Sequence, residues 1–141
     1  MSYDPNNVFA RIIRGELPAH RVYEDADTVT FMDLMPQADG HTLVIPKRAG
    51  EGLLDTSPDS LTAAMRTVQR VAAAVSLAFA PQGIVLTQFN GAAAGQTVFH
   101  LHFHIIPVYS GAVMEKHART MAPAERLAEH AERIRRALER G

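Results

Sequence analysis

The chain contains no cysteine among its 141 residues. It therefore forms no disulfide, has no thiolate nucleophile and cannot hold zinc through sulfur. Apolar runs long enough to span a bilayer are also absent, and the formal net charge is only −1. Neither a membrane nor nucleic acid is therefore an expected partner. The first seven residues, Met-Ser-Tyr-Asp-Pro-Asn-Asn, lack the basic and apolar regions of a signal peptide, which favours a cytoplasmic protein.

Length and composition predict one soluble globular domain. A chain of 141 residues with 47% hydrophobic and 21% charged residues can bury a single sizeable core. We expect one domain over 1–141, with its core at 7–108 and a helical extension at 120–141.

Hydrophobic spacing predicts the order of the helices and strands. Apolar residues at helical spacing predict helices over 8–14, 57–80 and 123–140. Short apolar runs between turn residues predict strands over 21–24, 28–32, 41–46, 84–89 and 100–108. These strands follow one another mostly in hairpin order around one long helix. The expected class is therefore α+β, with a five-stranded antiparallel sheet rather than a doubly wound parallel one.

The most informative segment is 98–107, where His100, His102 and His104 alternate with apolar residues. Successive side chains of a β-strand point to opposite faces, so the three imidazoles would share one face and the apolar residues would lie in the core. Histidine is the side chain whose ordinary pKa, about 6.5, suits chemistry near neutral pH. Three grouped histidines therefore indicate a functional site.

One interpretation of this row is a metal site. Alternate residues on a strand are about 6.6 Å apart, so two neighbouring histidines could chelate one zinc ion. The outer two histidines, about 13 Å apart, could not easily join the same ion. Further ligands would come from elsewhere in the chain, and His41 is the only obvious imidazole donor. The row alone does not make a metal site.

The loop before the row favours phosphate chemistry without a metal. In the segment 90–97, Gly91 and Gly95 allow backbone N–H groups to converge on an anion, and Gln96 and Thr97 add donors. A phosphate held there would lie against the histidines, where a neutral imidazole could attack phosphorus and form a covalent intermediate. A second imidazole and the loop N–H groups would stabilise the charge on the phosphoryl oxygens.

The segment 95–106, Gly-Gln-Thr-Val-Phe-His-Leu-His-Phe-His-Ile-Ile, closely resembles the signature of the histidine triad (HIT) superfamily. The resemblance runs from Phe9 to Pro107. It includes the segments 12–19, 22–25, 31–33 and 41–47. Within the superfamily, the chain is similar to the Hint-like branch of nucleotide-binding hydrolases found in many bacteria.

The resemblance implies the HIT fold and a homodimer whose two five-stranded sheets join into one. It also implies a purine nucleotide substrate that is cleaved at its α-phosphate, at a phosphoramidate, acyl-phosphate or phosphoanhydride bond. The reaction would pass through a nucleotidyl-histidine and release a nucleoside monophosphate, without a metal or other cofactor. The leaving group and the choice between adenine and guanine do not follow from the sequence.

The same resemblance implies different tasks for the histidines. His102 would be the nucleophile, and His104 would contact the α-phosphate. His100 would lie behind them in a relay with His41 that fixes the tautomers. The histidines outside every motif are expected at the surface, and these are His20, His117 and His130.

The resemblance also implies the residues that bind the nucleotide. Asp33 would accept hydrogen bonds from the ribose hydroxyls, although by itself it also suits a turn. The apolar slot for the base would be formed by residues that equally suit a core, namely Phe9, Ile12, Phe31 and Leu34. The residues expected at the phosphate and the leaving group are Asn90, Gly95, Gln96 and Thr97.

The chain departs from its bacterial relatives at a structural zinc site. Many of those proteins hold zinc with a Cys-x-x-Cys pair and two histidines. The aligned cysteine positions here are Asn7 and Ala10, one histidine is replaced by Ala49, and only His100 of that set remains. We therefore predict no structural zinc. A second departure is Phe89, which stands where some relatives have a polar residue.

Two other functions are compatible with these motifs. One is a nucleotide-binding regulatory module with little catalytic activity, and the other is a metal-dependent hydrolase. Formation of a nucleotidyl-histidine would distinguish the enzyme from the module, and sensitivity to a chelator would identify the metal enzyme.

Overall fold

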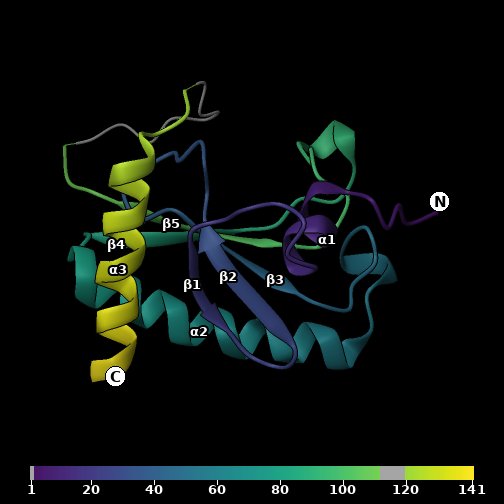
Figure 1. The fold of residues 1–141 in the computed structure, drawn as a ribbon, viewed down its shortest axis with the longest axis horizontal. Helices are drawn as coiled ribbons and strands as arrows, with labels where there is room; N and C mark the ends of the chain where they lie inside the picture. Colours follow the sequence, from purple (N-terminus) through teal and green to yellow (C-terminus); the bar gives the residue numbers. More distant parts are fainter. Residues whose placement is uncertain (1, 112–119) are drawn as a thin grey trace.

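The computed structural model describes residues 2–111 and 120–141 of the chain. In chain order, the elements are α1 (Val8–Ile13), β1 (Arg21–Glu24), β2 (Thr28–Met32), β3 (Thr42–Pro46), the short 3-10 helix η1 (Leu53–Asp55), α2 (Pro58–Phe79), β4 (Gly83–Thr87), the 3-10 helix η2 (Ala92–Ala94), β5 (Phe103–Val108) and α3 (Ala124–Arg140). In Figure 1, α2 runs along the sheet, α3 stands at one side of the strands, and α1 lies well away from α3.

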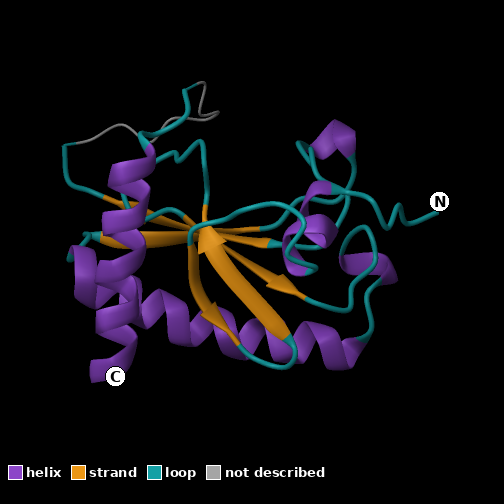
Figure 2. Ribbon diagram, in the orientation of Figure 1, coloured by secondary structure: helices purple, strands orange, loops and turns teal. Residues whose placement is uncertain are grey.

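The strands form one antiparallel sheet in the order β1-β2-β3-β5-β4 (Figure 2). This confirms the α+β class, the five-stranded antiparallel sheet, the single long helix and the C-terminal helix. Within the described ranges no helix is long and apolar enough to cross a membrane.

The long helix α2 has clear start and stop signals in the sequence. The Ser57 side chain caps it by accepting a hydrogen bond from the backbone N–H of Ser60, and Pro58 occupies the first turn. Val68, Val71 and Val75 recur at helical spacing and are buried against the sheet. The helix ends at Ala80, which adopts a left-handed backbone conformation with a φ of 47°.

The two faces of the sheet are covered differently. One face packs against α2 and α3 in a core that includes Val44 and Ile105 from the strands, Val71 from α2, and Leu127 and Ile134 from α3. The other face is covered by α1, in a smaller cluster. That cluster consists of Phe9, Ile12, Val29, Phe31, Leu43 and Ile45. Because α1 is only six residues long, it leaves room beside it on this face for a cavity.

The last strand is shorter than the alternating pattern predicts. It begins at Phe103 rather than at His100, so His104 is the only histidine of the row that lies in a strand. The register of β3 with β5 pairs Val44 with Phe103, and two residues further along β3 lies Pro46. Proline has no N–H to donate, which stops the ladder there. The preceding residues therefore follow an irregular path, in which Leu101 N–H bonds to the carbonyl of Gly50.

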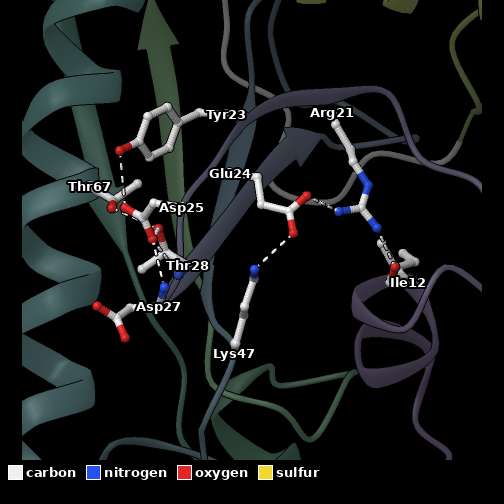
Figure 3. Close-up of polar contacts among 9 residues, drawn as sticks. All are labelled: Ile12, Arg21, Tyr23, Glu24, Asp25, Asp27, Thr28, Lys47 and Thr67. Carbon is white, nitrogen blue, oxygen red and sulfur yellow. Dashed lines mark hydrogen bonds and ion pairs between the residues drawn. The ribbon is translucent and has the colours of Figure 1, made fainter.

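Polar contacts around β1 fix the position of α1 (Figure 3). Arg21 donates to the carbonyl of Ile12 in α1 and also to the carboxylate of Glu24, which in turn pairs with Lys47 at 2.8 Å. Asp25 closes the turn between β1 and β2 by accepting hydrogen bonds from the backbone of 27–28. Among these contacts, the hydrogen bond from Arg21 to Ile12 is the one that ties α1 to the edge of the sheet.

The expectation of three surface histidines is wrong for one of them. His130 on α3 is buried, and its ring packs edge-to-face against Phe79 with 5.0 Å between ring centres. The apolar face of α3 must pack against α2, and His130 lies on that face beside Leu127 and Ile134. His20 is partly exposed, and His117 lies outside the described residues.

We predict that α3 contributes directly to stability through this core. Replacing Ile134, which is fully buried, by alanine removes buried methylene groups and leaves a cavity, at a cost of about 2–5 kcal/mol in the free energy of unfolding. The matched control is Leu54→Ala, at a side chain that is 92% exposed, with an expected change within about 0.5 kcal/mol. Urea unfolding measures both. Equal, small effects would show that α3 is not part of the core.

Candidate functional site

A cavity of about 210 Å³ lies on the open face of the sheet, between α1, the ends of β2 and β3, and the histidine segment. It brings together eight of the residues expected from the sequence: Phe9, Ile12, Phe31, Asp33, Leu34, Thr97, His102 and His104. Their sequence positions span almost a hundred residues, so the fold rather than local sequence assembles the site.

The apolar wall of this cavity is continuous with the smaller core cluster. Phe9 meets Phe31 edge-to-face with ring centres 5.5 Å apart, and it meets the His102 ring in the same way at 4.8 Å. Phe9, Ile12 and Phe31 are all buried and also line the cavity, whereas Leu34 at the rim is exposed. Phe9, Ile12 and Phe31 therefore belong to the core and also line the cavity, and their role as a slot for a base stays a prediction.

Backbone contacts fix the tautomer of His102. Its Nδ1 lies 2.7 Å from the carbonyl oxygen of His100. A carbonyl oxygen only accepts, so Nδ1 carries the proton and the lone pair is on Nε2. Burial lowers the pKa of His102 below its ordinary value of 6.5, which keeps the ring neutral near pH 7. A buried, neutral imidazole with a free Nε2 lone pair is a competent nucleophile.

The tautomers of His41 and His104 follow in the same way. The backbone N–H of Gln37 donates to His41 Nδ1 at 3.0 Å, so the His41 proton is on Nε2. That Nε2–H donates to His104 Nδ1 at 3.0 Å, so His104 carries its own proton on Nε2. Burial, together with a smaller effect of the neighbouring imidazoles, lowers the pKa of His41 to about 3 and that of His104 to about 4.

The expected relay between His100 and His41 is not formed. His41 pairs with His104, whereas His100 donates from Nε2 to the carbonyl of Pro46 at 2.8 Å and accepts at Nδ1 from the hydroxyl of Tyr3 at 2.5 Å. The reason is the early end of the β3–β5 ladder, which turns His100 away from the face that carries His104. Nothing in the sequence pattern pointed to Tyr3 or to the backbone N–H of Gln37.

Asp33 lies at the end of β2 and lines the cavity. Its Oδ1 accepts a hydrogen bond from the backbone N–H of Met35 at 2.8 Å, and its Oδ2 lies 3.5 Å from His41 Nε2. Burial raises the pKa of this carboxyl to about 6. Asp33 is therefore both a turn residue and a cavity residue, and near pH 7 it is an ionised hydrogen-bond acceptor.

The loop before the histidines differs from the expected phosphate-binding loop. The backbone N–H of Gly91 donates to the side-chain oxygen of Gln96, and the N–H groups of Gly95 and Gln96 donate to carbonyls of the loop itself. The amide NH₂ of Gln96 donates to the carbonyls of Glu51 and Val98. These donors are already paired, so the loop is an internally bonded support rather than an open cradle.

The four loop residues expected at the phosphate therefore do not lie together: one lines the histidine cavity, two line another cavity, and Gly95 lines neither. Thr97 reaches the histidine cavity. Asn90 and Gln96 line a different cavity of about 320 Å³, together with Glu51 and Asp55. Gly95 adopts a left-handed conformation with a φ of 108°, which turns the chain towards the histidines.

Asp33, His41 and His104 are the one group in the described ranges whose geometry could suit a metal ion, with ligand atoms within 4.8 Å of one another. Their hydrogen bonds do not fit a metal. His41 Nε2 carries the proton because Gln37 occupies Nδ1, so coordination at Nε2 would require an imidazolate. At the family's zinc positions, Asn7 instead caps α1 by accepting from the N–H of Ala10.

An antiparallel five-stranded sheet that carries paired histidines beside an apolar cavity defines a histidine triad protein. The HIT domain model matches residues 14–111. The chain belongs to this family.

Individual relatives agree with this assignment. The protein hit of Bacillus subtilis is 38% identical over 125 residues, covering 85% of this chain and 86% of that protein. The adenylylsulfatase HINT3 of Arabidopsis thaliana is 41% identical over 100 residues, covering 71% of this chain and 51% of that protein. A crystal structure of a Hit-like protein from Bartonella henselae superposes with a TM-score of 0.91 at 50% identity, covering 97% of this chain and 99% of that one.

We predict that acidification destabilises the protein through its buried histidines. Below pH 6.5 both His41 and His104 become protonated in the unfolded chain. In the folded chain His41 stays neutral down to about pH 3 and His104 down to about pH 4. The unfolded state then binds more protons, and each net proton lowers the stability by about 1.4 kcal/mol per pH unit. Asp33, whose pKa is raised from 3.8 to about 6, acts in the opposite direction and offsets part of this loss.

The urea midpoint should therefore fall between about pH 7 and about pH 5. His41→Gln, which removes one of the titrating groups, should show a shallower pH dependence than the wild type. A midpoint that rises on acidification would mean that the carboxyl, and not the imidazoles, dominates the titration.

Proposed function

We propose that the chain is a nucleotide hydrolase or nucleotidyl transferase that acts at the α-phosphate of a purine nucleotide conjugate through His102. The observation that carries this proposal is the tautomer of His102, whose Nε2 lone pair belongs to a ring that lines the cavity. A nucleophile of this kind beside an apolar slot and a carboxylate matches the demands of a nucleotide substrate.

The apolar wall suits a purine ring. The base would lie between Phe9 and Ile12 of α1 and Phe31 of β2, with Leu34 closing the exposed side. Asp33, ionised above about pH 6, would accept hydrogen bonds from the ribose hydroxyls. This orientation directs the α-phosphate towards the two cavity histidines.

Chemistry would then proceed in two displacements. The Nε2 lone pair of His102 attacks phosphorus, the N–P bond forms, and the leaving group departs with the electron pair of its broken bond to phosphorus. The His104 Nε2–H donates to a phosphoryl oxygen, and the carbonyl of His100 stabilises the His102 ring as it becomes positively charged. Water next attacks phosphorus, the N–P bond breaks, a proton passes to solvent, and the nucleoside monophosphate leaves.

His102→Ala should abolish turnover of an adenosine phosphoramidate while retaining affinity for AMP, because the apolar slot and Asp33 are unchanged. Loss of a nucleophile typically costs several orders of magnitude in kcat, about 10⁶-fold in well-studied cases. Rapidly quenched wild-type enzyme should carry an adenylyl group on His102 by mass spectrometry. The matched control is His20→Ala, outside the cavity, with unchanged kinetics.

Two results would contradict this mechanism. One is turnover near the wild-type rate by His102→Ala. The other is tight AMP binding by the wild type with no adenylyl-enzyme and no turnover of phosphoramidates or dinucleoside polyphosphates. The second result would instead identify a nucleotide-binding regulatory module.

We further propose that two copies pair through β4, as the resemblance to the family implies. β4 is at the edge of the sheet, and Leu86 on this strand is 45% exposed. Antiparallel pairing of β4 with its copy would satisfy the open edge and continue the sheet across a two-fold axis. Leu77 near the end of α2 is also exposed and would add apolar surface.

Light scattering should therefore give the mass of a dimer for the wild type and that of a monomer for Leu86→Lys. Met121→Lys, at an exposed residue outside the strand, should remain dimeric. A monomeric wild type at micromolar concentration would refute the proposed pairing.

A further inference from the structure

The turn 33–40 determines which ring nitrogens of His41 and His104 carry their protons. Its first two residues, Asp33 and Leu34, line the cavity, and its Gln37 N–H holds His41 in the tautomer that donates to His104. The turn closes on itself, because Asp33 N–H donates to the carbonyl of His41 and His41 N–H donates to that of Ala38. Displacement of this turn would therefore change both the rim of the cavity and the histidine tautomers.

The C-terminal extension, 120–141, contacts this turn at its beginning. The backbone N–H of Ala122 donates to the carbonyl of Leu34 at 3.0 Å. Ala122 is also packed against the main core, so this contact is fixed relative to α2 and α3. Leu34 belongs to the cavity, whereas Ala122 does not.

The extension also supports the end of the turn, through Phe79. A Cβ at Gly40 would lie only 3.1 Å from the Phe79 ring, so the ring packs directly against the backbone next to His41. Gly40 also has a φ of 91°, which favours glycine at this position. Two side chains of α3 hold that ring. His130 packs edge-to-face against it, and the Arg133 guanidinium lies 4.3 Å from its centre.

We propose that the C-terminal extension positions the His41–His104 pair by holding the turn 33–40 at both ends. Ala122 and His130 are positioning residues in this proposal, since neither reaches the cavity. Coupling of this kind runs through contiguous contacts, here from Ala122 to Leu34 and from His130 through Phe79 to Gly40. A third contact with the turn does not involve the extension: the Tyr109 hydroxyl donates to the carbonyl of Asp39 at 2.7 Å. This hydrogen bond limits how far the turn moves when the contacts of the extension are removed.

Loss of the positioning has a defined chemical consequence. Without the Gln37 N–H, His41 can move its proton to Nδ1, and its Nε2 lone pair then faces the lone pair on His104 Nδ1. His104 must then shift its own proton to Nδ1, which removes the Nε2–H that would donate to the phosphoryl oxygen. A mixture of tautomers therefore lowers the fraction of competent enzyme.

Two pairs of variants test this in the full-length protein. Ala122→Pro removes the N–H that bonds to Leu34, and its matched control Ala122→Ser retains it. His130→Ala removes the ring that supports Phe79, and His130→Phe retains an aromatic ring there. In each pair the first variant should disturb the turn and the second should preserve it.

The primary measurement is the tautomer of His41 and His104 by ¹⁵N NMR of the imidazole rings, which needs no substrate. Ala122→Pro and His130→Ala should show His41 partly protonated at Nδ1, and both controls should retain the wild-type tautomers. Because activity rests on the function proposed above, kinetics are the second measurement. A fall in kcat/KM of about 2- to 30-fold is expected for the two disrupting variants.

Wild-type tautomers in folded Ala122→Pro and His130→Ala would overturn the proposal and reduce the extension to a stabilising element. Should the wild type turn over no nucleotide conjugate, the function proposed above fails, but the NMR comparison still tests the positioning. Thermal unfolding of each variant distinguishes a positioning role of the extension from a purely structural one. A purely structural role lowers Tm without changing the tautomers.

Discussion

The hydrogen bond from His102 Nδ1–H to the carbonyl of His100 is the interaction on which the chemistry of this site depends. It fixes the proton on one ring nitrogen and leaves a lone pair on the other. Burial then keeps the ring neutral, because a charged imidazole would lose its hydration without a paired anion. The backbone also sets the tautomers of His41, through Gln37, and of His100, through Pro46. In the proposed mechanism, no ionised side chain is therefore needed to prepare His102 as the nucleophile.

This bond exists because the histidine row is not one regular strand. In an extended strand the side chains stand perpendicular to the sheet and the carbonyls point towards the neighbouring strands, so the side chain of residue i does not meet the carbonyl of residue i−2. Here Pro46 ends the ladder between β3 and β5, and the chain before Phe103 bends so that the His100 carbonyl meets the His102 ring. A feature of β3 therefore determines the geometry of a segment more than fifty residues later. The alternating pattern predicts three imidazoles on one face of a strand, whereas the structure brings only His102 and His104 to the cavity.

Much of the fold followed from local pattern, and the parts that did not follow depend on partners distant in sequence. The helix over Pro58–Phe79 carried its own cap and apolar face, and short connections make neighbours of β1, β2 and β3. The place of β5 between β3 and β4 did not follow from local pattern, because long connections that include α2 separate these strands in the chain. The partner of His41 could not be predicted this way. Alternation tells which face a side chain occupies, but the pairing of Leu43 with His104 in the sheet register is what brings His41 to His104.

The same limit applied to residues whose type suggested exposure or binding. Gln96 has the donors of a phosphate ligand, yet its amide is buried and bonds to backbone carbonyls on both sides of the loop. His130 has a polar ring, yet it fills space beside Phe79 because it falls on the apolar face of α3. Glu51, one of the two carbonyl partners of Gln96, and Phe79, the packing partner of His130, each lie more than forty residues away in the chain, and composition gives no information about them.

The electrostatics of the cavity follow from these contacts. Among the described residues that line it, Asp33 is the only one with an ordinarily charged side chain, and neither lysine nor arginine is present. An anionic phosphate bound beside His102 would therefore be stabilised by N–H dipoles, above all the His104 Nε2–H, and not by a cation. Such dipoles are effective in a buried site, where the effective dielectric constant is low and the donors are held in place before the substrate arrives. The proposed function therefore depends on the orientation of neutral imidazoles and, through His41, on the turn 33–40.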